Sequence, residues 1–442
     1  MIEINGKYAK DVKIFTDDIE DGALSLIYDI ANSPMFDGAH IRIMPDVHLG
    51  KGITIGFTCP LGEFVNPDHV GCDIGCTISA DFFDKPIEEK DYPLFEHRIK
   101  MAIPFGMNYQ EKTMFEEKDF VKFVNSAIQK AYQRAKDYIN YVQFKNMDEL
   151  DKWAEKFGMS STIFYKSIGT IGGGNHFVEY DECDGKYAFV VHTGSRNLGQ
   201  KVWKYWNKVA DGTKISKDGI RKITEETKAN FNGDKNELGD AIKKAVEEYR
   251  KALHPGYLSG DEMKGYLTDM VICQAYAAYN HKIVHEIAAK VYNGINGGHV
   301  VDSIVSSHNY IDFNGDVPIV RKGSIRSYEG ERMLIPFNMR DGVAVCEGKS
   351  NPDWNYSAPH GAGRKMSRSK AKEEISLDSF KESIKDVYST TVCKNTIDEA
   401  PAAYKPMEEI IENIEPTCNV LFLMKPKINI KADDGDISYS KK

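Results

Sequence analysis

The segment Tyr187-Ala-Phe-Val-Val-His-Thr-Gly-Ser-Arg196 starts as a continuous apolar run and ends in polar residues. Valine and phenylalanine favour an extended strand, and the glycine shortly after the run marks its end. His192 is therefore expected at the tip of a buried strand, a common place for a ligand-binding side chain. Similar apolar runs, each predicted to be a strand, lie at Ile41–Met44, Ile53–Thr58, Val300–Val305, Gly342–Cys346 and Asn419–Met424.

Two stretches rich in lysine, alanine and glutamate separate these runs, at about 119–157 and about 216–292. In the second, Ser259-Gly-Asp-Glu262 has the form of a capping box and precedes apolar residues at helical spacing. We expect an α+β fold with one domain over residues 1–442. Helical insertions near 110–160 and 216–292 would cover packed β-sheets that form a metal pocket. The polar tail, residues 432–442, is expected to fray.

The composition is that of a globular protein, with 41% hydrophobic and 28% charged residues among 442. The longest apolar run, Val420–Met424, is far shorter than the ~20 residues of a membrane span. The N-terminus lacks the pattern of a signal peptide. Eight cysteines are scattered without a disulfide rhythm, which favours free thiols in a reducing compartment. These features predict a cytoplasmic protein without membrane contact.

A net charge of −9 argues against a wide basic face for nucleic acid. Two local basic patches are still present. The larger has no acid within its stretch and comprises Arg364, Lys365, Arg368, Lys370 and Lys372; the smaller comprises Arg321, Lys322 and Arg326. A solvated helix face is the simpler explanation of such clusters. The larger patch, however, follows a glycine-rich turn, which favours phosphate binding.

The loop Gly71-Cys-Asp-Ile-Gly-Cys76 places a carboxylate and a thiol three residues apart between glycines. Both side chains can then converge on one ion, and a thiolate can bridge two. Thiolate, carboxylate and imidazole together suit Mn²⁺, Zn²⁺, Fe²⁺ or Co²⁺ better than Ca²⁺ or Mg²⁺. Taken alone, the loop is more often a buried turn than a ligand set.

A second glycine-rich segment, Gly169-Thr-Ile-Gly-Gly-Gly-Asn-His-Phe-Val-Glu179, adds an amide, an imidazole and a carboxylate. Consecutive glycines let backbone amides approach a phosphate closely. The segment matches neither the P-loop nor the dinucleotide-binding fingerprint. It therefore predicts a phosphate or metal site of another kind.

Further histidines follow glycine or serine motifs at Ser306-Ser-His308 and His360-Gly-Ala-Gly-Arg364. A lone histidine is more often a satisfied structural side chain than a ligand, but several such motifs in one chain favour a shared site. His360, beside phosphate-binding cations, is a candidate nucleophile at phosphorus. The structural interpretation is kept for the remaining histidines, including the helical pair with i, i+4 spacing: His40, His97, His254, His281, His285 and His299.

The order of these motifs resembles the RtcB family of RNA ligases over nearly the whole chain. The matching blocks are Pro45-Asp46-Val-His48, Asp73-Ile-Gly-Cys76, Gly172-Gly-Gly-Asn175-His176, His192-Thr-Gly-Ser-Arg196, His308-Asn-Tyr310, His360-Gly-Ala-Gly-Arg364 and Asp398-Glu-Ala-Pro-Ala-Ala-Tyr404-Lys405. The resemblance implies a GTP- and Mn²⁺-dependent ligase that joins RNA 3′-phosphate or 2′,3′-cyclic phosphate ends to 5′-hydroxyl ends. Its steps would pass through a histidine–GMP adduct and an RNA 3′-guanylate.

The resemblance also implies a role for each matched residue. The ligands of two Mn²⁺ ions would be Asp73, Cys76, His176, His192 and His308. Asp46 would support the site without binding metal, and His360 would become guanylylated. Guanylate would be bound by Asn175, Glu179, His360, Gly361, Ala362, Gly363, Tyr404 and Lys431, and RNA or triphosphate oxygens by Arg196, Arg364 and Arg368. The partners would be broken RNA, such as tRNA halves, with an archease-like activator as a further candidate.

The chain departs from the family pattern at a few positions. Cys72 and Thr77 stand where the family usually has valine and glycine, and Phe337-Asn-Met-Arg340 replaces a Gly-Ser-Met-Gly nucleotide loop. Guanine preference is affected more than catalysis, because the matched ligands and His360 are retained. Two other functions remain open: a metal-dependent phosphodiesterase that opens cyclic phosphates without ligation, and an RNA-binding module with a structural metal. Labelling of the protein by GTP and a metal count distinguish them.

Overall fold

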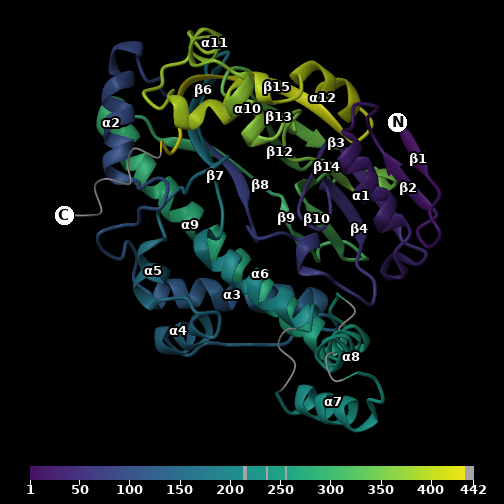
Figure 1. The fold of residues 1–442 in the computed structure, drawn as a ribbon. Coiled ribbons are helices and arrows are strands. Elements are labelled where there is room, and N and C mark those ends of the chain that lie inside the picture. Colours follow the sequence, from purple (N-terminus) through teal and green to yellow (C-terminus); the bar gives the residue numbers. More distant parts are fainter. Residues whose placement is uncertain (213–216, 235–236, 254–255, 434–442) are drawn as a thin grey trace.

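The computed structural model describes residues 1–212, 217–234, 237–253 and 256–433, and it contains two large sheets and one small one (Figure 1). The six-stranded sheet has the order β1 (Ile2–Ile4), β2 (Asp11–Ile14), β3 (His40–His48), β4 (Ile55–Pro60), β10 (Ile319–Lys322), β9 (Asn309–Asp312). The seven-stranded sheet has the order β12 (Arg332–Asn338), β13 (Gly342–Gly348), β15 (Cys418–Ile430), β6 (Phe177–Cys183), β7 (Lys186–Thr193), β5 (Thr77–Phe83), β8 (Val300–Ser307). β11 (Ser324–Arg326) pairs with β14 (Ser357–Pro359).

The strands expected from apolar runs are confirmed, with boundaries shifted by a few residues. The largest difference is in β15, whose apolar start continues through Lys425 and Pro426 to Ile430, with a register shift between Pro426 and Ile428. Proline cannot donate to a ladder hydrogen bond, so the irregularity falls where the sequence has one. This extension matters because it carries Asn429 and leads to Lys431.

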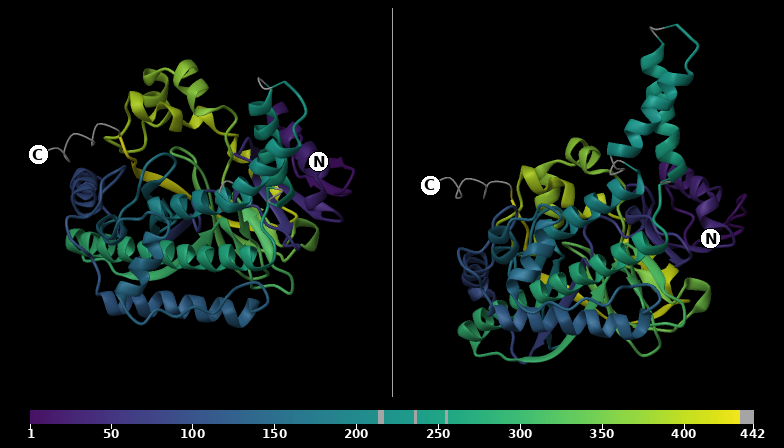
Figure 2. Two further views of the ribbon diagram at one scale, coloured as in Figure 1. Left: turned by 60° about the horizontal axis from the view of Figure 1, so that its bottom comes forward. Right: turned by 90° about the horizontal axis from the view of Figure 1, so that it is seen from below.

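The helices lie around the sheets (Figures 1 and 2): α9 contacts β5 and β7 of the seven-stranded sheet, α2 contacts β15, and α12 contacts both β3 and β15. The α-helices of the described residues are α1 (Asp21–Ala31), α2 (Tyr92–Ala102), α3 (Glu117–Ala135), α4 (Met147–Glu155), α5 (Ser161–Lys166), α6 (Arg196–Ala210), α7 (Lys217–Asn230), α8 (Leu238–Leu253), α9 (Gly260–Asn296), α10 (Arg368–Glu374), α11 (Leu377–Ser383) and α12 (Met407–Ile414). The first helical stretch becomes α3 and α4, and the second becomes α7, α8 and most of α9. The expected α+β architecture of packed sheets with helical insertions is confirmed.

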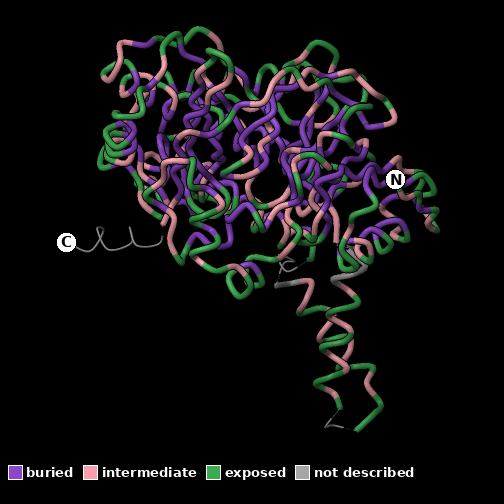
Figure 3. Tube along the Cα trace, turned by 90° about the horizontal axis from the view of Figure 1, so that it is seen from above, coloured by how far each residue is buried: buried purple, intermediate pink, exposed green. Residues whose placement is uncertain are grey.

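The long helix α9 is the axis of the helical layer. Its buried side chains occur all around the helix, because it packs on α2, α3 and α6 and on strands β5 and β7. By contrast, α7 and α8 pack on each other and stand away from the body, where the side chains whose burial is described are exposed or half-buried (Figures 2 and 3). The site described below lies among buried residues, far from this helical pair.

Two local expectations are wrong. Ser259 does precede α9, but its side chain makes no capping hydrogen bond. Most of the smaller basic patch is not at the surface: Arg321 is buried against Asp312 at 2.6 Å, and Lys322 donates to three backbone carbonyls, while Arg326 is partly exposed and pairs with Glu331.

Within the described residues no helix combines the length and apolarity that a membrane span requires. All eight cysteines are free, as expected. His254 and nearly all of the tail lie outside the described residues.

Candidate metal and nucleotide site

The expected metal ligands lie at one end of the seven-stranded sheet. Cys76 precedes β5, His176 precedes β6, His192 is near the end of β7, and His308 follows β8. The four strands are adjacent in the order β6, β7, β5, β8, and each runs antiparallel to its neighbours. Strands that start and strands that end at one edge therefore bring together residues up to 232 positions apart in the chain.

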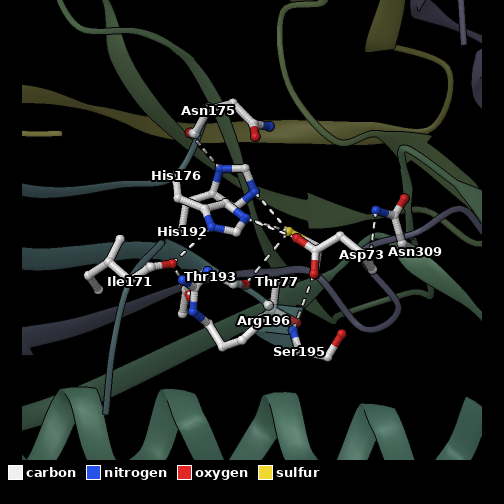
Figure 4. Close-up of polar contacts among 12 residues, drawn as sticks. Asp73, Thr77, Ile171, Asn175, His176, His192, Thr193, Ser195, Arg196 and Asn309 are labelled. Carbon is white, nitrogen blue, oxygen red and sulfur yellow. Dashed lines mark hydrogen bonds and ion pairs between the residues drawn. The ribbon is translucent and has the colours of Figure 1, made fainter. Parts of the chain in front are cut away.

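The side chains of this group converge closely (Figure 4). Cys76 Sγ lies 3.2 Å from His192 Nε2 and 3.5 Å from His176 Nε2. His192 Nε2 and His308 Nε2 are 3.3 Å apart. Asp73 Oδ2 lies 3.0 Å from His176 Nε2. All five residues that the resemblance implied as ligands are thus in one cluster.

Two of the imidazoles are oriented from behind by backbone carbonyls. His176 Nδ1 donates to Ile171 O at 2.9 Å, and His192 Nδ1 donates to Asn175 O at 3.1 Å. With the proton on Nδ1, the Nε2 lone pair points into the cluster, which is how ligating histidines are usually held. Burial, then the neighbouring histidines, lowers the pKa of His192 and of His308 well below the usual range. Neutral imidazoles are the form that binds metal.

Asp73 approaches the cluster through space left by a glycine. A Cβ on Gly194 would lie 2.3 Å from Asp73 Oδ1, so no larger residue fits there. The same oxygen accepts from Ser195 N at 3.2 Å. Burial alone would raise the pKa of Asp73, but the hydrogen bond and charge of His176 outweigh it and leave a value of about 2. The carboxylate is therefore ionised at neutral pH.

This donor set fits a transition-metal ion. Cys76 Sγ, His192 Nε2 and His308 Nε2 meet at 3.2 and 3.3 Å, and His308 Nδ1 has no hydrogen-bond partner among the described residues. Cys76 Sγ, His176 and His192 also bring ligand atoms within 4.8 Å of one another. Thiolate, carboxylate and neutral imidazole suit Mn²⁺, Zn²⁺, Fe²⁺ or Co²⁺.

His360 lies next to the metal cluster, with its ring centroid 4.8 Å from that of His308. Its Nδ1 contacts Asp46 Oδ2 at 2.6 Å, and the same oxygen accepts from the His360 backbone N at 3.2 Å. Asp46 belongs to β3 of the six-stranded sheet and His360 directly follows β14 of the small sheet, so this contact connects those two sheets. Gly363 permits it: its φ is 75°, and a Cβ there would lie 2.2 Å from Asp46 O. Asp46 fixes the Nδ1–H tautomer, which leaves the Nε2 lone pair of His360 unprotonated.

A cavity of about 460 Å³ opens beside His360. It is lined by the segment 360–364, by Phe337, Asn338 and Met339 of the divergent loop, and by Asn175, Glu179, Arg368, Tyr404 and Lys431. The structure thus brings together all the residues that the resemblance implied for guanylate. Arg196 is not part of this lining; its guanidinium donates to Thr170 Oγ1 and Gly106 O beside the triple-glycine loop.

Glu399, which the sequence analysis did not single out, is the central acid of this cavity. It is buried and accepts from Lys431 Nζ at 2.9 Å and Tyr404 OH at 2.8 Å. Arg368 Nη1 lies 2.5 Å away. Burial raises the pKa of Glu399, but the charges of Lys431, Arg368 and Arg364 outweigh burial and bring the pKa to about 2. Glu399 therefore holds the cations of the cavity in place.

In the folded chain, acidic side chains from a later segment neutralise part of the larger basic patch. Arg368 also pairs with Asp398 at 2.6 Å, and Lys372 with Asp398 at 3.4 Å. These acids lie thirty residues further along the chain, so their proximity was not visible in the patch itself. The position of Glu399 next to Asp398 in the Asp-Glu-Ala-Pro motif was the one signal available.

Two further lining residues were missed. Asn429 of β15 donates to Glu179 Oε1 at 2.5 Å; burial raises the pKa of Glu179 to about 7, although this bond lowers it. His48 Nδ1 donates to Asp46 O at 2.9 Å, and burial lowers the pKa of His48 to about 4, so this ring is neutral beside His360. Nothing in the sequence marks Asn429, because its role depends on the pairing of β15 with β6.

Comparisons with known proteins agree on one family. The family model described as tRNA-splicing ligase RtcB matches residues 27–432. The RNA-splicing ligase RtcB of Escherichia coli (strain K12) is 27% identical over 440 residues, covering 93% of this chain and 95% of the relative. The tRNA-splicing ligase RtcB of Aeropyrum pernix is 23% identical and covers 84% of this chain and 83% of the relative. The RNA-splicing ligase RtcB of Mycobacterium tuberculosis is 24% identical and covers 84% and 91%.

Proposed function

The chain belongs to the RtcB family of tRNA-splicing ligases, and on this premise we propose that it joins RNA 3′-phosphate or 2′,3′-cyclic phosphate ends to 5′-hydroxyl ends. GTP would be the co-substrate and Mn²⁺ the metal. The observation that carries the proposal is the His360–Asp46 pair, which faces a nucleotide-sized cavity directly beside the metal cluster.

His360 is proposed as the nucleophile. Asp46 holds the proton on Nδ1, so the Nε2 lone pair attacks the α-phosphorus of GTP, a P–N bond forms, and pyrophosphate leaves with the electrons of the broken P–O bond. An oxygen of the RNA 3′-phosphate then attacks the same phosphorus, and the P–N electrons return to Nε2. Finally the 5′-hydroxyl attacks the RNA 3′-phosphorus, loses its proton, and displaces GMP. A cyclic phosphate would first be opened by water.

The cations of the cavity are proposed to bind the phosphates. Arg364, Arg368 and Lys431 are already held by Glu399, so binding costs little side-chain ordering. An entering triphosphate competes with Glu399 for the same donors, which favours polyanions over singly charged ligands. Asn175, Glu179 and Tyr404 are proposed to contact the nucleoside, with Gly361, Ala362 and Gly363 leaving room for it, and Arg196 is proposed for RNA.

Asp73, Cys76, His176, His192 and His308 are proposed to hold two Mn²⁺ ions. When bound, the metal would supply Lewis-acid stabilisation of phosphate charge. We propose that the chain is one domain over residues 1–442 and acts in the cytoplasm on broken RNA. An archease-like protein is a candidate activator.

Incubation with [α-³²P]GTP and Mn²⁺, followed by a denaturing gel, tests the proposal. We expect a labelled protein band that disappears in acid, persists in alkali, and is absent from His360→Ala. His97→Ala is the matched control, since His97 is an exposed histidine on α2, and it should label normally. His360→Ala should still seal RNA that already carries a 3′-guanylate. If cyclic phosphates are opened but no protein is labelled, the chain is a phosphodiesterase and the ligase proposal fails.

A further inference from the structure

The helix α6 differs from the other helices in charge. Its sequence, Arg196-Asn-Leu-Gly-Gln-Lys-Val-Trp-Lys-Tyr-Trp-Asn-Lys-Val-Ala210, carries one arginine, three lysines and no acidic residue. Every other α-helix of the described residues, except the short α5, contains an aspartate or a glutamate. In a chain with a net charge of −9, α6 is therefore a local concentration of positive charge, and the sequence analysis did not single it out.

The lysines of α6 lie on its solvent side. The exposed residues follow one another at intervals of three or four, so they share one side of the helix, and they are Asn197, Gln200, Lys204 and Lys208. Lys201 and Trp203 are half-buried at the two edges of this side. The exposed Lys51 adds a further cation, because its Nζ lies 4.1 Å from the centroid of the Trp203 ring. We call Lys51, Lys201, Lys204 and Lys208 the α6 basic face.

Two acids contact side chains of α6, and each has another cation beside it. Asp68 accepts from Trp203 Nε1 at 2.8 Å, and Lys322 Nζ donates to the backbone carbonyl of Asp68 at 2.8 Å. Asp269 is buried beneath the helix, where it accepts from Trp206 Nε1 and pairs with Lys156 at 3.4 Å. Lys201 donates to Gly158 O, a neutral acceptor, so its positive charge is retained.

The first turn of α6 lies against the proposed metal ligands. Ser195 N, directly before the helix, donates to Asp73 Oδ1 at 3.2 Å (Figure 4). A Cβ on Gly199 would lie 3.2 Å from Cys72 O, so the helix packs closely on the loop that carries Asp73. From there α6 extends for 15 residues, which is about 22 Å. The α6 basic face therefore leads from the cluster of proposed metal ligands toward solvent.

The α6 basic face is separate from the proposed nucleotide site. No residue of α6 lines the His360 cavity, and the ring of His360 approaches the cluster at His308, whereas α6 approaches it at Asp73. In a displacement at phosphorus, the attacking and leaving oxygens are roughly in line. If GMP leaves toward the His360 cavity, the 5′-hydroxyl has to enter from another side of the cluster, and α6 lies on such a side.

We propose that the α6 basic face binds the backbone of the RNA strand that carries the 5′-hydroxyl end. The assignment to this strand rests on the proposed ligase function. Lysine contacts to phosphates supply sequence-independent affinity and position the strand. Lys204 and Lys208 are one turn apart, with about 5–6 Å between their Cβ atoms, so they can contact neighbouring phosphates. A solvated helix face is the usual explanation of surface lysines, but it does not account for a helix that lacks acids and begins at the proposed metal ligands.

Filter binding of a short RNA with a 5′-hydroxyl and no 3′-phosphate, over a series of salt concentrations, tests the surface. In Lys204→Gln/Lys208→Gln, the slope of log affinity against log salt should fall by about 1.4, because each lost contact to single-stranded RNA contributes about 0.7. In ligation with saturating 3′-phosphate RNA, the KM for the 5′-hydroxyl RNA should rise roughly tenfold. The KM for the 3′-phosphate RNA should not change.

Lys118→Gln/Lys122→Gln is the matched control, since it removes the same charge from two exposed lysines one turn apart on α3, and it should leave the slope and both KM values unchanged. An equal fall of the slope in both double variants, an unchanged slope in Lys204→Gln/Lys208→Gln, or a raised KM for the 3′-phosphate RNA alone would overturn the proposal. Labelling of His360 by GTP involves no RNA. A wild-type chain that GTP does not label contradicts the proposed function, whereas the salt slope still decides whether α6 binds RNA.

Discussion

Two aspartate–histidine pairs in this molecule look alike but are set up for different chemistry. In one, Asp46 contacts His360 Nδ1 at 2.6 Å; in the other, Asp81 contacts His285 Nδ1 at 2.9 Å. The difference is on the far side of each ring. His360 faces an open cavity lined by cations, whereas His285 Nε2 meets the Ser79 hydroxyl.

The carboxylate alone therefore does not define the role of the imidazole. With no hydroxyl opposite Nε2, the ring needs one proton, keeps a free lone pair, and is suited to attack phosphorus. In the second pair the Ser79 hydroxyl lies 2.7 Å from His285 Nε2, so that nitrogen already has a partner. The cluster of proposed metal ligands is a third case, in which ring nitrogens, a thiol and a carboxylate converge on one place.

We expect the largest effect on bound Mn²⁺, which should differ between variants of the proposed metal ligands and variants of the α9 histidines. Cys76→Ala should lose bound Mn²⁺ and all detectable ligation, because Cys76 Sγ contacts both His176 and His192. His281→Gln should keep its Mn²⁺, since His281 on α9 is not among the proposed metal ligands. Metal content after dialysis measures both. Cys183→Ala, a half-buried thiol outside the cluster, is the control, and full metal content in Cys76→Ala would remove Cys76 from the ligand set.

The next effect compares the two aspartates directly. Asp46→Asn should slow guanylylation of His360 by roughly 10–100-fold, because the amide no longer enforces the Nδ1–H tautomer. Asp81→Asn should label at a rate close to that of the wild type. Single-turnover labelling with [α-³²P]GTP measures the rates. Equal slowing in both variants would mean that the two pairs do not differ in role.

A smaller effect concerns the acid that orders the His360 cavity. Glu399→Gln should lower the free energy of unfolding by about 2–3 kcal/mol at pH 7, since Lys431 and Arg368 lose a charged partner. The pKa of Glu399 is lowered to about 2, so this contribution is present above ~4.3 and is lost as pH falls toward 2. Urea unfolding at pH 7 and pH 4 checks it. Glu286→Gln, on an exposed α9 ion pair, should cost at most ~0.5 kcal/mol.

The smallest effect tests where RNA binds. Arg368→Ala should reduce the slope of log affinity against log salt by roughly one, the value for one lost phosphate contact. Lys282→Ala, on α9 and outside the lining of the His360 cavity, should leave the slope unchanged. Filter binding of a 3′-phosphate RNA over a series of salt concentrations measures it. An unchanged slope in Arg368→Ala places the RNA outside the His360 cavity.

The strands and the two helical stretches could be predicted from the sequence, as could the set of candidate metal ligands. Apolar runs such as Tyr187–His192 are short and β-branched, which favours buried strands, and Asp73 and Cys76 became candidates because several such motifs occur in one chain. The family resemblance rested on the same motifs, and the family model confirmed it. His360, the proposed nucleophile, was likewise a candidate because of the small residues that follow it.

The contacts between polar groups that are far apart in the sequence depend on the tertiary structure and could not be predicted. Glu399 neutralises a patch that contains no acid of its own, and Arg321 disappears into the core, because pairing depends on which strands are neighbours. Asn429 reaches Glu179 only through the β15–β6 register. The helical spacing of His281 and His285 was plain in the sequence, but not that Ser79 lies between them. That contact depends on how α9 packs on β5.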